Sequence, residues 1–345
     1  MENSKDALEK LGSVVSGKKE LLILTHTHPD PDAIAAAVAL RLLLKELFHV
    51  GASIAYSGII ARAENRAMVK KLNLPLKQYS RIKLSRYDGI ALVDSQPGAG
   101  NNVLDASSPC DIVIDHHPRR DDTKGAFVVI EPELGASATM LIEWLDAAGV
   151  DLSADIATAL AYAISSETQN MYREAARRDI RAYLSVYVRA SIRKLAGIIN
   201  ANLPHYYFLQ LGDAINNALM FGTMITTHLD EIRHPEIVAE MADFLLKHER
   251  IGTVLVSGRF RNHLIISIRT RSEGINAGRL IKQLPLDPDN VGGHDRTAGG
   301  FFDLHGKDRK EVEEINITIR NAFAALLGYE NPSWRKLLDQ VPRKS

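Results

Sequence analysis

The sequence predicts an α/β protein with a mostly parallel sheet flanked by helices, followed by a second, smaller mixed α/β domain. In the first half, short apolar runs of strand length alternate with longer segments of helical periodicity. Such alternation requires crossover connections, which join parallel strands. From Ala218 onward the pattern restarts with its own strand and helix signals, and the 345 residues are enough for two domains.

The elements expected in the first domain follow one another with short connections. They are strands at 20–25, 51–58, 89–94 and 111–116, and helices at 32–47, up to Leu72, 135–150 and 153–168. A long amphipathic stretch from Glu174 to about Ile199 has few turn signals and could bridge to the second domain. We place the first domain at 1–195, a connector at 196–217, the second domain at 218–330 and a C-terminal tail at 331–345.

The second domain is expected to hold a mixed sheet with its own helices. Its elements are a strand near 218–227, a helix near 235–248, adjacent strands at 251–260 and 263–270, a helix at 274–284, a glycine-rich loop at 292–300, a short strand and a closing helix from about Lys310. The segment GRFRN separates the two adjacent strands as the turn of a hairpin would.

The charge balance and the single cysteine narrow the class of protein. Lysine plus arginine equal aspartate plus glutamate, 42 against 42, so the whole chain does not attract long nucleic acid, although a local basic cleft is compatible with this balance. The only cysteine, Cys110, cannot form an internal disulfide, which fits a reducing compartment. The most apolar stretch is interrupted by Arg41 and is shorter than the ~20 residues of a membrane span. We therefore expect a soluble, cytoplasmic protein without membrane contact.

The run THTHPDPD directly follows the first predicted strand and offers four candidate metal ligands. These are His26, His28, Asp30 and Asp32. All four have even numbers, so they line one face if the segment is extended, and the two prolines keep the residues before them extended. Imidazole with carboxylate suits Mn²⁺, Zn²⁺, Fe²⁺ or Co²⁺. The alternative is a polar turn in which Asp32 caps the helix that begins at Ala33.

Polar residues also follow two later apolar runs. Asp94 ends the run ALVD, and VIDHHP contributes Asp115, His116 and His117. Ligands bind outside the carboxyl ends of parallel strands, so all these side chains are expected along one rim of the sheet. One of the adjacent histidines can bind metal while the other faces substrate, with Asp115 orienting a histidine. Each motif taken alone has a simpler interpretation: Asp94 could be an ordinary turn residue, and the two histidines could lie in a surface turn.

Together these motifs resemble the DHH phosphoesterase superfamily. The resemblance rests on the His-x-His-Pro-Asp-x-Asp run, on the Asp-His-His run and on GGHDRTAGG at 292–300, and it extends from about Leu21 to Phe302. The last motif is similar to the Gly-Gly-Gly-His-x-x-Ala-Ala-Gly pattern of the DHH-associated C-terminal domain. The resemblance implies that the first domain is the catalytic, metal-binding DHH domain and that the second binds substrate.

The resemblance also implies two divalent metal ions, with Mn²⁺ the expected ion. One ion would be held by His26, Asp30 and Asp94, and the other by Asp32, Asp94, His116 and Glu167. Asp94 would bridge the two ions. His117 would contact the phosphate under attack. His28 stands where many family members have asparagine, so it is placed beside the metals with a catalytic contact to phosphate, and its role as a ligand is left open.

Glu167 departs from the family pattern, which places an aspartate before a threonine at this point. The matching segment here is AISSETQNM, with Glu167 before Thr168. The extra methylene has to be accommodated, so weaker binding of the second metal, a changed metal preference or reduced activity could follow. The alternative is that Glu167 is only the last residue of a helix.

The glycine-rich motif of the second domain suggests an anion site. Gly292 and Gly293 let backbone N–H groups approach an anion closely, and His294 adds a donor. Arg269, at a strand end, resembles the family arginine that grips a substrate phosphate. Asn276 either caps the following helix or touches the nucleotide, with the cap favoured.

The resemblance implies phosphoester hydrolysis by a hydroxide that bridges the two metals. Among the branches of the superfamily, the compact two-domain form is most similar to the nanoRNase and pAp-phosphatase enzymes. Expected substrates are short oligoribonucleotides, linear dinucleotides such as pApA, and 3′-phosphoadenosine 5′-phosphate. Two alternatives stay open: a phosphatase for polyphosphate or another small phosphate, and a catalytically weakened nucleotide-binding regulator, motivated by Glu167. The sequence also allows a homodimer.

Overall fold

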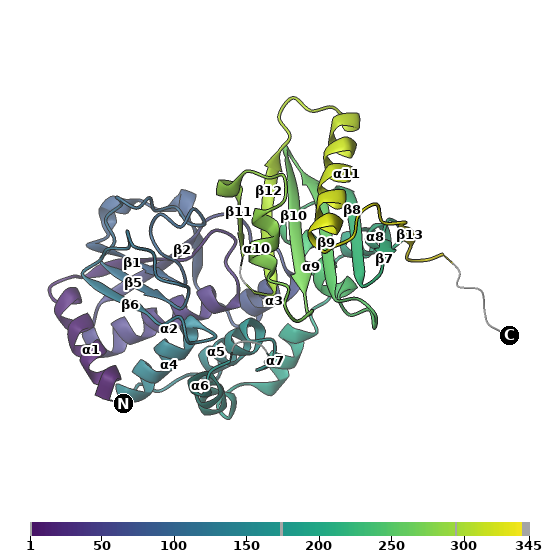
Figure 1. Cartoon of the computed structure of the whole chain (residues 1–345). Coiled ribbons are helices and arrows are strands. Elements are labelled where there is room, and N and C mark those ends of the chain that lie inside the picture. The colour runs from purple at the N-terminus through teal and green to yellow at the C-terminus, as the bar shows by residue number, and fades with distance from the viewer. Residues whose placement is uncertain (1, 173–174, 294, 340–345) are drawn as a thin grey trace. The chain divides into compact units, whose positions relative to one another are not determined.

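The computed structural model describes residues 2–172, 175–293 and 295–339. The chain divides into two compact units, Met1–Asn202 and Leu203–Ser345, coloured from purple to teal and from teal to yellow in Figure 1. The division falls inside the segment 196–217 that the sequence suggests as a connector. That segment contains the end of one helix, α7 (Ile192–Ile199), and all of another, α8 (His205–Asn216).

The first unit contains a six-stranded sheet in which every neighbouring pair is parallel. The strand order is β3-β2-β1-β4-β5-β6. The strands are β1 (Glu20–Leu24), β2 (Gly51–Tyr56), β3 (Leu76–Gln78), β4 (Gly89–Val93), β5 (Ile112–Asp115) and β6 (Phe127–Ile130). The predicted parallel α/β fold is confirmed. Strands β3 and β6, which are only three and four residues long, are not among the elements that the sequence predicts.

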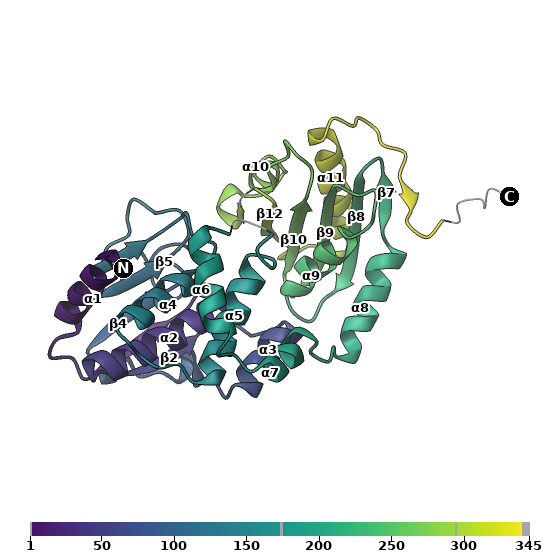
Figure 2. The same ribbon diagram turned by 90° about the horizontal axis from the view of Figure 1, so that it is seen from below.

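Alternate residues of β1 face opposite sides of this sheet. Leu21 and Ile23 pack into the large core formed with the helices, whereas Leu22 and Leu24 face a smaller core. Long helices thus cover one side, as Figure 2 shows for α2, α4 and α5. Loops and the 3₁₀ helices Tyr79–Arg81 and Leu84–Arg86 cover the other side.

Helices α2 to α5 lie where the sequence predicts helices, whereas the N-terminal helix α1 is not among the predicted elements. The helices of the first unit are α1 (Glu2–Val15), α2 (Pro31–Phe48), α3 (Ala63–Lys71), α4 (Ser137–Ala147), α5 (Ala154–Glu167), α6 (Arg177–Tyr187) and α7 (Ile192–Ile199). The described part of the predicted amphipathic stretch therefore forms two helices, α6 and α7, rather than one continuous segment. The break ends at Ser191, whose side chain accepts a hydrogen bond from the Lys194 backbone N–H and caps α7.

Helix α2 begins directly after the polar run and is the central helix of the core. Asp30, and not Asp32, caps it by accepting a hydrogen bond from the Ala33 N–H at 2.9 Å, and Pro31 occupies the first turn. Residues 33–40 are all buried, because α2 packs against both α4 and α5. The small alanine side chains let these helices approach closely while β1 lies beneath them.

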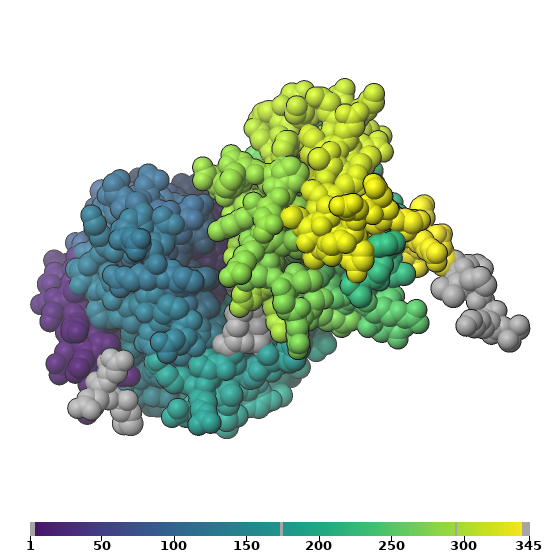
Figure 3. Space-filling model, viewed as in Figure 1, coloured from purple at the N-terminus to yellow at the C-terminus, as the bar shows by residue number. Residues whose placement is uncertain are grey.

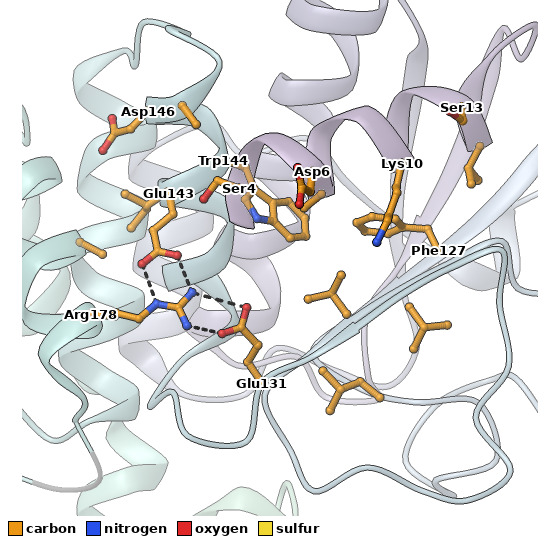
Figure 4. A pocket seen from close by; sticks show the side chains of 18 of the residues that line it. Ser4, Asp6, Lys10, Ser13, Phe127, Glu131, Glu143, Trp144, Asp146 and Arg178 are labelled. Carbon is orange, nitrogen blue, oxygen red and sulfur yellow. Dashed lines mark hydrogen bonds and ion pairs between the residues drawn. The ribbon is translucent and has the colours of Figure 1, made fainter. Parts of the chain in front are cut away.

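Helix α6 is tied to its neighbours by a charged side chain. Arg178 donates to Glu143 of α4, with Nε 2.9 Å from Oε1 and a second bond of 2.6 Å, and it also pairs with Glu131 after β6 (Figure 4). Its hydrogen bond to Glu143 is the largest influence on the pKa of Arg178 and raises it. The charge of Arg178 is thus balanced by the carboxylates of Glu143 and Glu131.

The second unit contains a mixed seven-stranded sheet in the order β11-β12-β10-β9-β8-β7-β13. Its strands are β7 (Leu219–Phe221), β8 (Met224–Glu231), β9 (Thr253–Phe260), β10 (His263–Thr270), β11 (Val291–Gly293), β12 (Thr297–Asp303) and β13 (Arg335–Lys336). Strands β8 and β9 are parallel and the other pairs are antiparallel. The expected hairpin of two adjacent strands is β9–β10, so the prediction of a second, mixed α/β domain is confirmed.

Helices cover both faces of this second sheet. Helix α8 and helix α9 (Glu236–Leu245) pack on the face that carries Val254 and Val256. Helices α10 (Ala277–Lys282) and α11 (Arg309–Leu326) pack on the opposite face, with Leu255. None of the helices described in either unit is long and apolar enough to cross a membrane.

The sequence predicts a glycine-rich loop at 292–300. In the structure, the described residues of this segment belong instead mainly to the paired strands β11 and β12. Gly292 pairs with Gly299, and Gly293 with Ala298, across β11 and β12. Gly293 has φ +153°, and a Cβ atom added there would lie 2.5 Å from the Ala298 Cα. Glycine is needed at this position because the two backbones approach too closely for any side chain.

Candidate metal centre

The candidate site lies at the carboxyl ends of three neighbouring strands of the first unit. His26 follows β1, Asp94 follows β4, and His116 follows β5. In the strand order, the chain leaves β1 toward β2 on one side and returns to β4 on the other. Such a switch point opens a crevice at the strand ends, where parallel α/β proteins bind ligands.

One group of ligand atoms combines His26, Asp30 and Asp94. The His26 Nε2 atom lies 3.6 Å from Asp30 Oδ1 and 3.6 Å from Asp94 Oδ2. One ligand atom from each of the three residues lies within 4.8 Å of the others, which is compatible with a shared metal ion. This is the set that the sequence suggested for one metal.

A second group uses the other oxygen of Asp94. Asp94 Oδ1 lies 3.4 Å from His116 Nε2 and 3.9 Å from His117 Nδ1. Asp32 Oδ2 approaches the same His116 nitrogen at 4.0 Å. The two oxygens of Asp94 therefore face different histidines, as a carboxylate between two metal ions would.

The backbone and Ser137 fix the position of Asp94. Asp94 has φ +57°, which is unusual for a residue other than glycine, and its N–H donates to the Ile114 carbonyl at 2.8 Å. The Ser137 hydroxyl donates to Asp94 Oδ1 at 3.0 Å, and the Asp94 side chain is buried. Strained backbone conformations of this kind persist where the surrounding structure holds them, often at functional sites.

The start of helix α4 holds Asp32. The backbone N–H groups of Ser137 and Ala138 donate to the two Asp32 oxygens at 2.6 and 2.9 Å. These first-turn N–H groups have no partner within their own helix, so a carboxylate from α2 satisfies them. Ser137 thus contacts both Asp32 and Asp94. The sequence does not single out Ser137, because serine is common at the start of helices whatever their function.

The environment of His116 fits a metal ligand. Its Nδ1 is bonded to the Leu134 carbonyl at 3.1 Å and therefore carries the proton. Its Nε2, with the lone pair, is buried between Asp32 and Asp94 and has no hydrogen-bond partner among the described residues. A buried acceptor that faces two carboxylates is unfavourable unless a cation lies between them. The side chains present therefore fit divalent metal binding.

The protonation behaviour of the centre leads to the same conclusion. Burial, with the charge of Asp94, holds the pKa of Asp32 well above its usual range, and burial with the charge of Asp30 does the same for Asp94. Burial alone would lower the pKa of His26, but contact with Asp30 and the charges of Asp30 and Asp94 raise it to about 10. The crowded carboxylates thus retain protons in the absence of another cation.

His117 is the more exposed of the two adjacent histidines. Its Nδ1 is bonded to Asp115 Oδ1 at 2.8 Å, the orienting contact that the sequence suggested for Asp115. Burial acts to lower the pKa of His117, but the bond to Asp115 and the charge of Asp94 raise it to about 10. Gln96 donates to the other Asp115 oxygen at 2.7 Å. Gln96 gave no signal in the sequence, because its contact spans two strand ends.

His28 and Glu167 lie outside both groups of ligand atoms found among the described residues. His28 has φ +59° and its Nδ1 accepts a hydrogen bond from the Ile59 N–H at 3.1 Å, so it is held by the loop after β2. Glu167 is the last residue of α5. Its charge contributes to raising the pKa of both Asp32 and His117, which places it near the centre.

The predicted substrate residues of the second unit have structural partners of their own. Arg269 Nε donates to Asp243 Oδ1 at 2.7 Å, and another guanidinium nitrogen bonds the Ser267 hydroxyl at 2.9 Å. Asn276 caps α10, which is the role that the sequence favours. Its side-chain amide also donates to Asp295. Gly292 and Gly293 lie in β11. His294 lies outside the described residues.

A parallel α/β unit with histidines and aspartates at its switch point defines an α/β protein with a candidate metal centre. The DHH family, N-terminal domain, matches residues 20–164, and the DHHA1 domain matches residues 221–324. The chain belongs to the DHH phosphoesterase superfamily and has a C-terminal DHHA1 domain, which confirms the resemblance found in the sequence.

Two curated relatives are similar to this chain. An uncharacterized protein of Methanocaldococcus jannaschii is 36% identical over 309 residues, which are 86% of this chain and 62% of that protein. The chain thus spans less than two thirds of that relative's length. The bifunctional oligoribonuclease and PAP phosphatase NrnA of Thermus thermophilus is 26% identical over 233 residues, 63% of this chain and 69% of that protein.

A solved structure shares the fold. It is an exopolyphosphatase-related protein from Bacteroides fragilis, with a TM-score of 0.74 over 94% of this chain and 98% of that one. Its sequence identity is 15%, so the likeness concerns the fold alone.

Proposed function

We propose that this protein is a divalent-metal-dependent phosphoesterase. Its proposed substrates are short oligoribonucleotides, linear dinucleotides such as pApA, and 3′-phosphoadenosine 5′-phosphate. The observation that carries the proposal is the placement of Asp94, with Oδ2 3.6 Å from His26 and Oδ1 3.4 Å from His116. A single buried carboxylate between two imidazoles is the arrangement that a two-metal centre needs.

In this proposal, His26 and Asp30 would hold one ion, Asp32 and His116 would hold the other, and Asp94 would contribute to both. Two bound ions, for which Mn²⁺ is the expected metal, would supply Lewis-acid stabilisation of the phosphate and acidify a water. Ser137 keeps Asp94 in place through its hydroxyl.

The remaining histidine has a separate proposed role. His117 is 43% exposed while Asp115 beneath it is almost fully buried, so the imidazole can reach a ligand while its partner holds it. A protonated His117 donates to a phosphoryl oxygen and offsets the charge that develops there. Glu167 and His28 are proposed to act beside the centre, Glu167 on the second ion and His28 on phosphate.

The proposed substrate class is supported by a relative and by the second domain. The NrnA relative is named as an oligoribonuclease and PAP phosphatase, and it matches 63% of this chain. The DHHA1 domain supplies a glycine hairpin together with Arg269, the groups proposed to bind a substrate phosphate. Short nucleotides are proposed on this basis.

A panel of metals and substrates tests the proposal. Purified protein is incubated with Mn²⁺, Mg²⁺, Co²⁺ or Zn²⁺ and with one substrate at a time. The substrates are pApA, short oligoribonucleotides longer than a dinucleotide, 3′-phosphoadenosine 5′-phosphate and polyphosphate. We expect metal-dependent release of mononucleotide or phosphate from the nucleotide substrates, reduced at least ~100-fold in Asp94→Asn. Asp105→Asn, a substitution on an exposed loop, is the matched control and is expected to keep full activity. Hydrolysis of polyphosphate without hydrolysis of pApA or 3′-phosphoadenosine 5′-phosphate would contradict the substrate class.

A further inference from the structure

A separate groove lies within the second unit, between helix α11 and strands β8 and β9. Figures 1 and 2 both show α11 beside these strands, and the same helix, in yellow, lies on the outer surface of the unit in Figure 3. The groove has a cavity volume of about 710 Å³, within the range of small-molecule sites. Residues from the glycine hairpin do not line it, so it is distinct from the anion site proposed above.

The groove contains a half-buried arginine that forms no ion pair among the described residues. Arg320 of α11 lines it, and its Nε atom is buried without a hydrogen-bond partner among the described residues. Its one contact of note is with the ring of Trp334, 6.0 Å from the guanidinium carbon. Burial lowers the pKa of Arg320, the opposite of the effect on Arg178, which two carboxylates surround. Partial burial of a guanidinium is unfavourable unless an anion compensates its charge.

The acidic residues of the groove do not supply that anion. Asp230, Glu231 and Glu313 line its rim and are exposed, so water screens their charges. The nearest ion pair is Arg309 with Asp230, at 3.7 Å, and both side chains are largely exposed. The half-buried Arg320 and the exposed carboxylates therefore leave the part of the groove beside Arg320 suited to a negatively charged group.

A row of hydrogen-bonded side chains lies across the same groove. The buried Ser257 hydroxyl donates to Asn316 Oδ1 at 2.7 Å, so it must accept the bond from His228 Nδ1 at 2.9 Å. His228 then carries its proton on Nδ1, and burial favours the neutral ring by lowering its pKa. This leaves His228 Nε2 as an acceptor and Asn316 Nδ2 as a donor, both without a partner among the described residues. Such a pair matches the polar edge of a nucleobase.

We propose that this groove is a second binding site, which takes a small organic phosphate of mononucleotide size. Arg320 contacts the phosphate, while Asn316 and His228 contact a polar edge that both donates and accepts. Apolar side chains, among them Leu255 and Val312, line the remainder and can cover a flat ring. The site lies in the DHHA1 domain and needs no metal, so it does not depend on the proposed phosphoesterase activity.

The two tryptophans of the chain give a local readout of this site. Trp334 contacts Arg320, whereas Trp144 is buried in the core of the first unit. The full chain is labelled with 5-fluorotryptophan, freed of metal with chelator, and titrated with adenosine 5′-monophosphate, inorganic phosphate or adenosine, with ¹⁹F resonances as the signal. We expect a saturable shift of the Trp334 resonance, tightest with adenosine 5′-monophosphate, weaker with phosphate and at least tenfold weaker with adenosine.

Variants locate the effect. Arg320→Met and Asn316→Asp are each expected to weaken binding of adenosine 5′-monophosphate at least tenfold, the first by removing the cation and the second by adding a negative charge. Arg250→Met, an exposed arginine of the same unit, and Asp94→Asn are expected to leave the titration unchanged. The proposal is overturned if Trp334 does not respond to millimolar adenosine 5′-monophosphate, if adenosine binds equally well, or if both groove variants, verified as folded by circular dichroism, bind like the unmodified protein.

Discussion

Glu167 stands where the sequence resemblance implies an aspartate. Its charge reaches Asp32 and His117, the residues proposed for the second metal and for phosphate. We expect Glu167→Gln to weaken the apparent affinity for the second metal about tenfold, since loss of a supporting carboxylate has costs of this order. Glu167→Asp keeps the charge and is expected to fall between Gln and the unmodified protein. The measurement is activity against Mn²⁺ concentration.

A matched substitution at an exposed position separates this effect from general changes in charge. Glu133→Gln removes the same charge from a loop before α4 and is expected to leave the metal dependence unchanged. If Glu167→Gln behaves like Glu133→Gln, Glu167 is only the last residue of its helix.

Asp115 is a positioning residue whose effect can be read from pH. The bond from Asp115 to His117, at 2.8 Å, helps to raise the pKa of His117 to about 10. In the metal-free protein His117 is therefore protonated, and able to donate, at pH values below about 10. In Asp115→Asn the pKa of His117 falls toward its usual value near 6.5. We expect activity to be retained near pH 6 and lost progressively between pH 7 and 9.

The readouts are a pH profile of kcat and an NMR titration of His117 in the metal-free protein. A uniform drop in kcat at all pH values would instead indicate that Asp115 serves only to hold the fold.

At the residue scale, sequence and structure agree where a motif is local. His26, Asp30, Asp94 and His116 converge because parallel strands bring their carboxyl ends to one edge. The supporting contacts could not be predicted in this way. Ser137 meets Asp32 from a residue 105 positions away, and the sequence holds no local pattern for such a contact.

At the scale of elements, the glycine hairpin of β11 and β12 gives a matched pair of substitutions. A Cβ at Gly293 would meet the backbone of Ala298 at 2.5 Å, in a φ region that side chains rarely adopt. A Cβ at Gly292 would meet nothing within 4 Å. We expect Gly293→Ala to lower the free energy of unfolding by about 1–3 kcal/mol and Gly292→Ala to leave it nearly unchanged.

Chemical denaturation measures the two stabilities, and substrate KM adds a functional readout. If the Gly292 backbone approaches a substrate phosphate, Gly292→Ala raises KM without loss of stability. Equal stability of the two variants would mean that the backbones of Gly293 and Ala298 do not approach each other this closely.

The same hairpin shows why some elements escape prediction. Glycine has low strand propensity and frequent use in loops, so the run from Gly292 to Gly300 resembles a loop, yet close backbone pairing explains its glycines. The short strands β3 and β6 escape for another reason. Their three and four residues are too few to establish a period, and only pairing with a neighbour defines them.

At the scale of the whole molecule, metal binding should be coupled to proton release. In the metal-free protein, His26 has a pKa of about 10, and the pKa values of Asp32 and Asp94 are raised by burial. These groups must lose their protons to bind a cation. We therefore expect metal affinity to increase with pH below about 10, by roughly tenfold per pH unit for each proton released.

Calorimetry of Mn²⁺ binding in two buffers with different heats of ionisation counts the protons released. At pH 7 we expect about one proton or more per ion bound at His26, because its imidazole is protonated there and must be neutral to act as a ligand. Asp94→Asn removes the carboxylate that lies 3.6 Å from His26 and 3.4 Å from His116, and it should reduce both the affinity and the number of protons released. An affinity that does not change between pH 6 and 8, with no buffer-dependent heat, would show that the ions bind elsewhere than at this cluster, since its protonated histidine and carboxylates cannot take a cation without releasing protons.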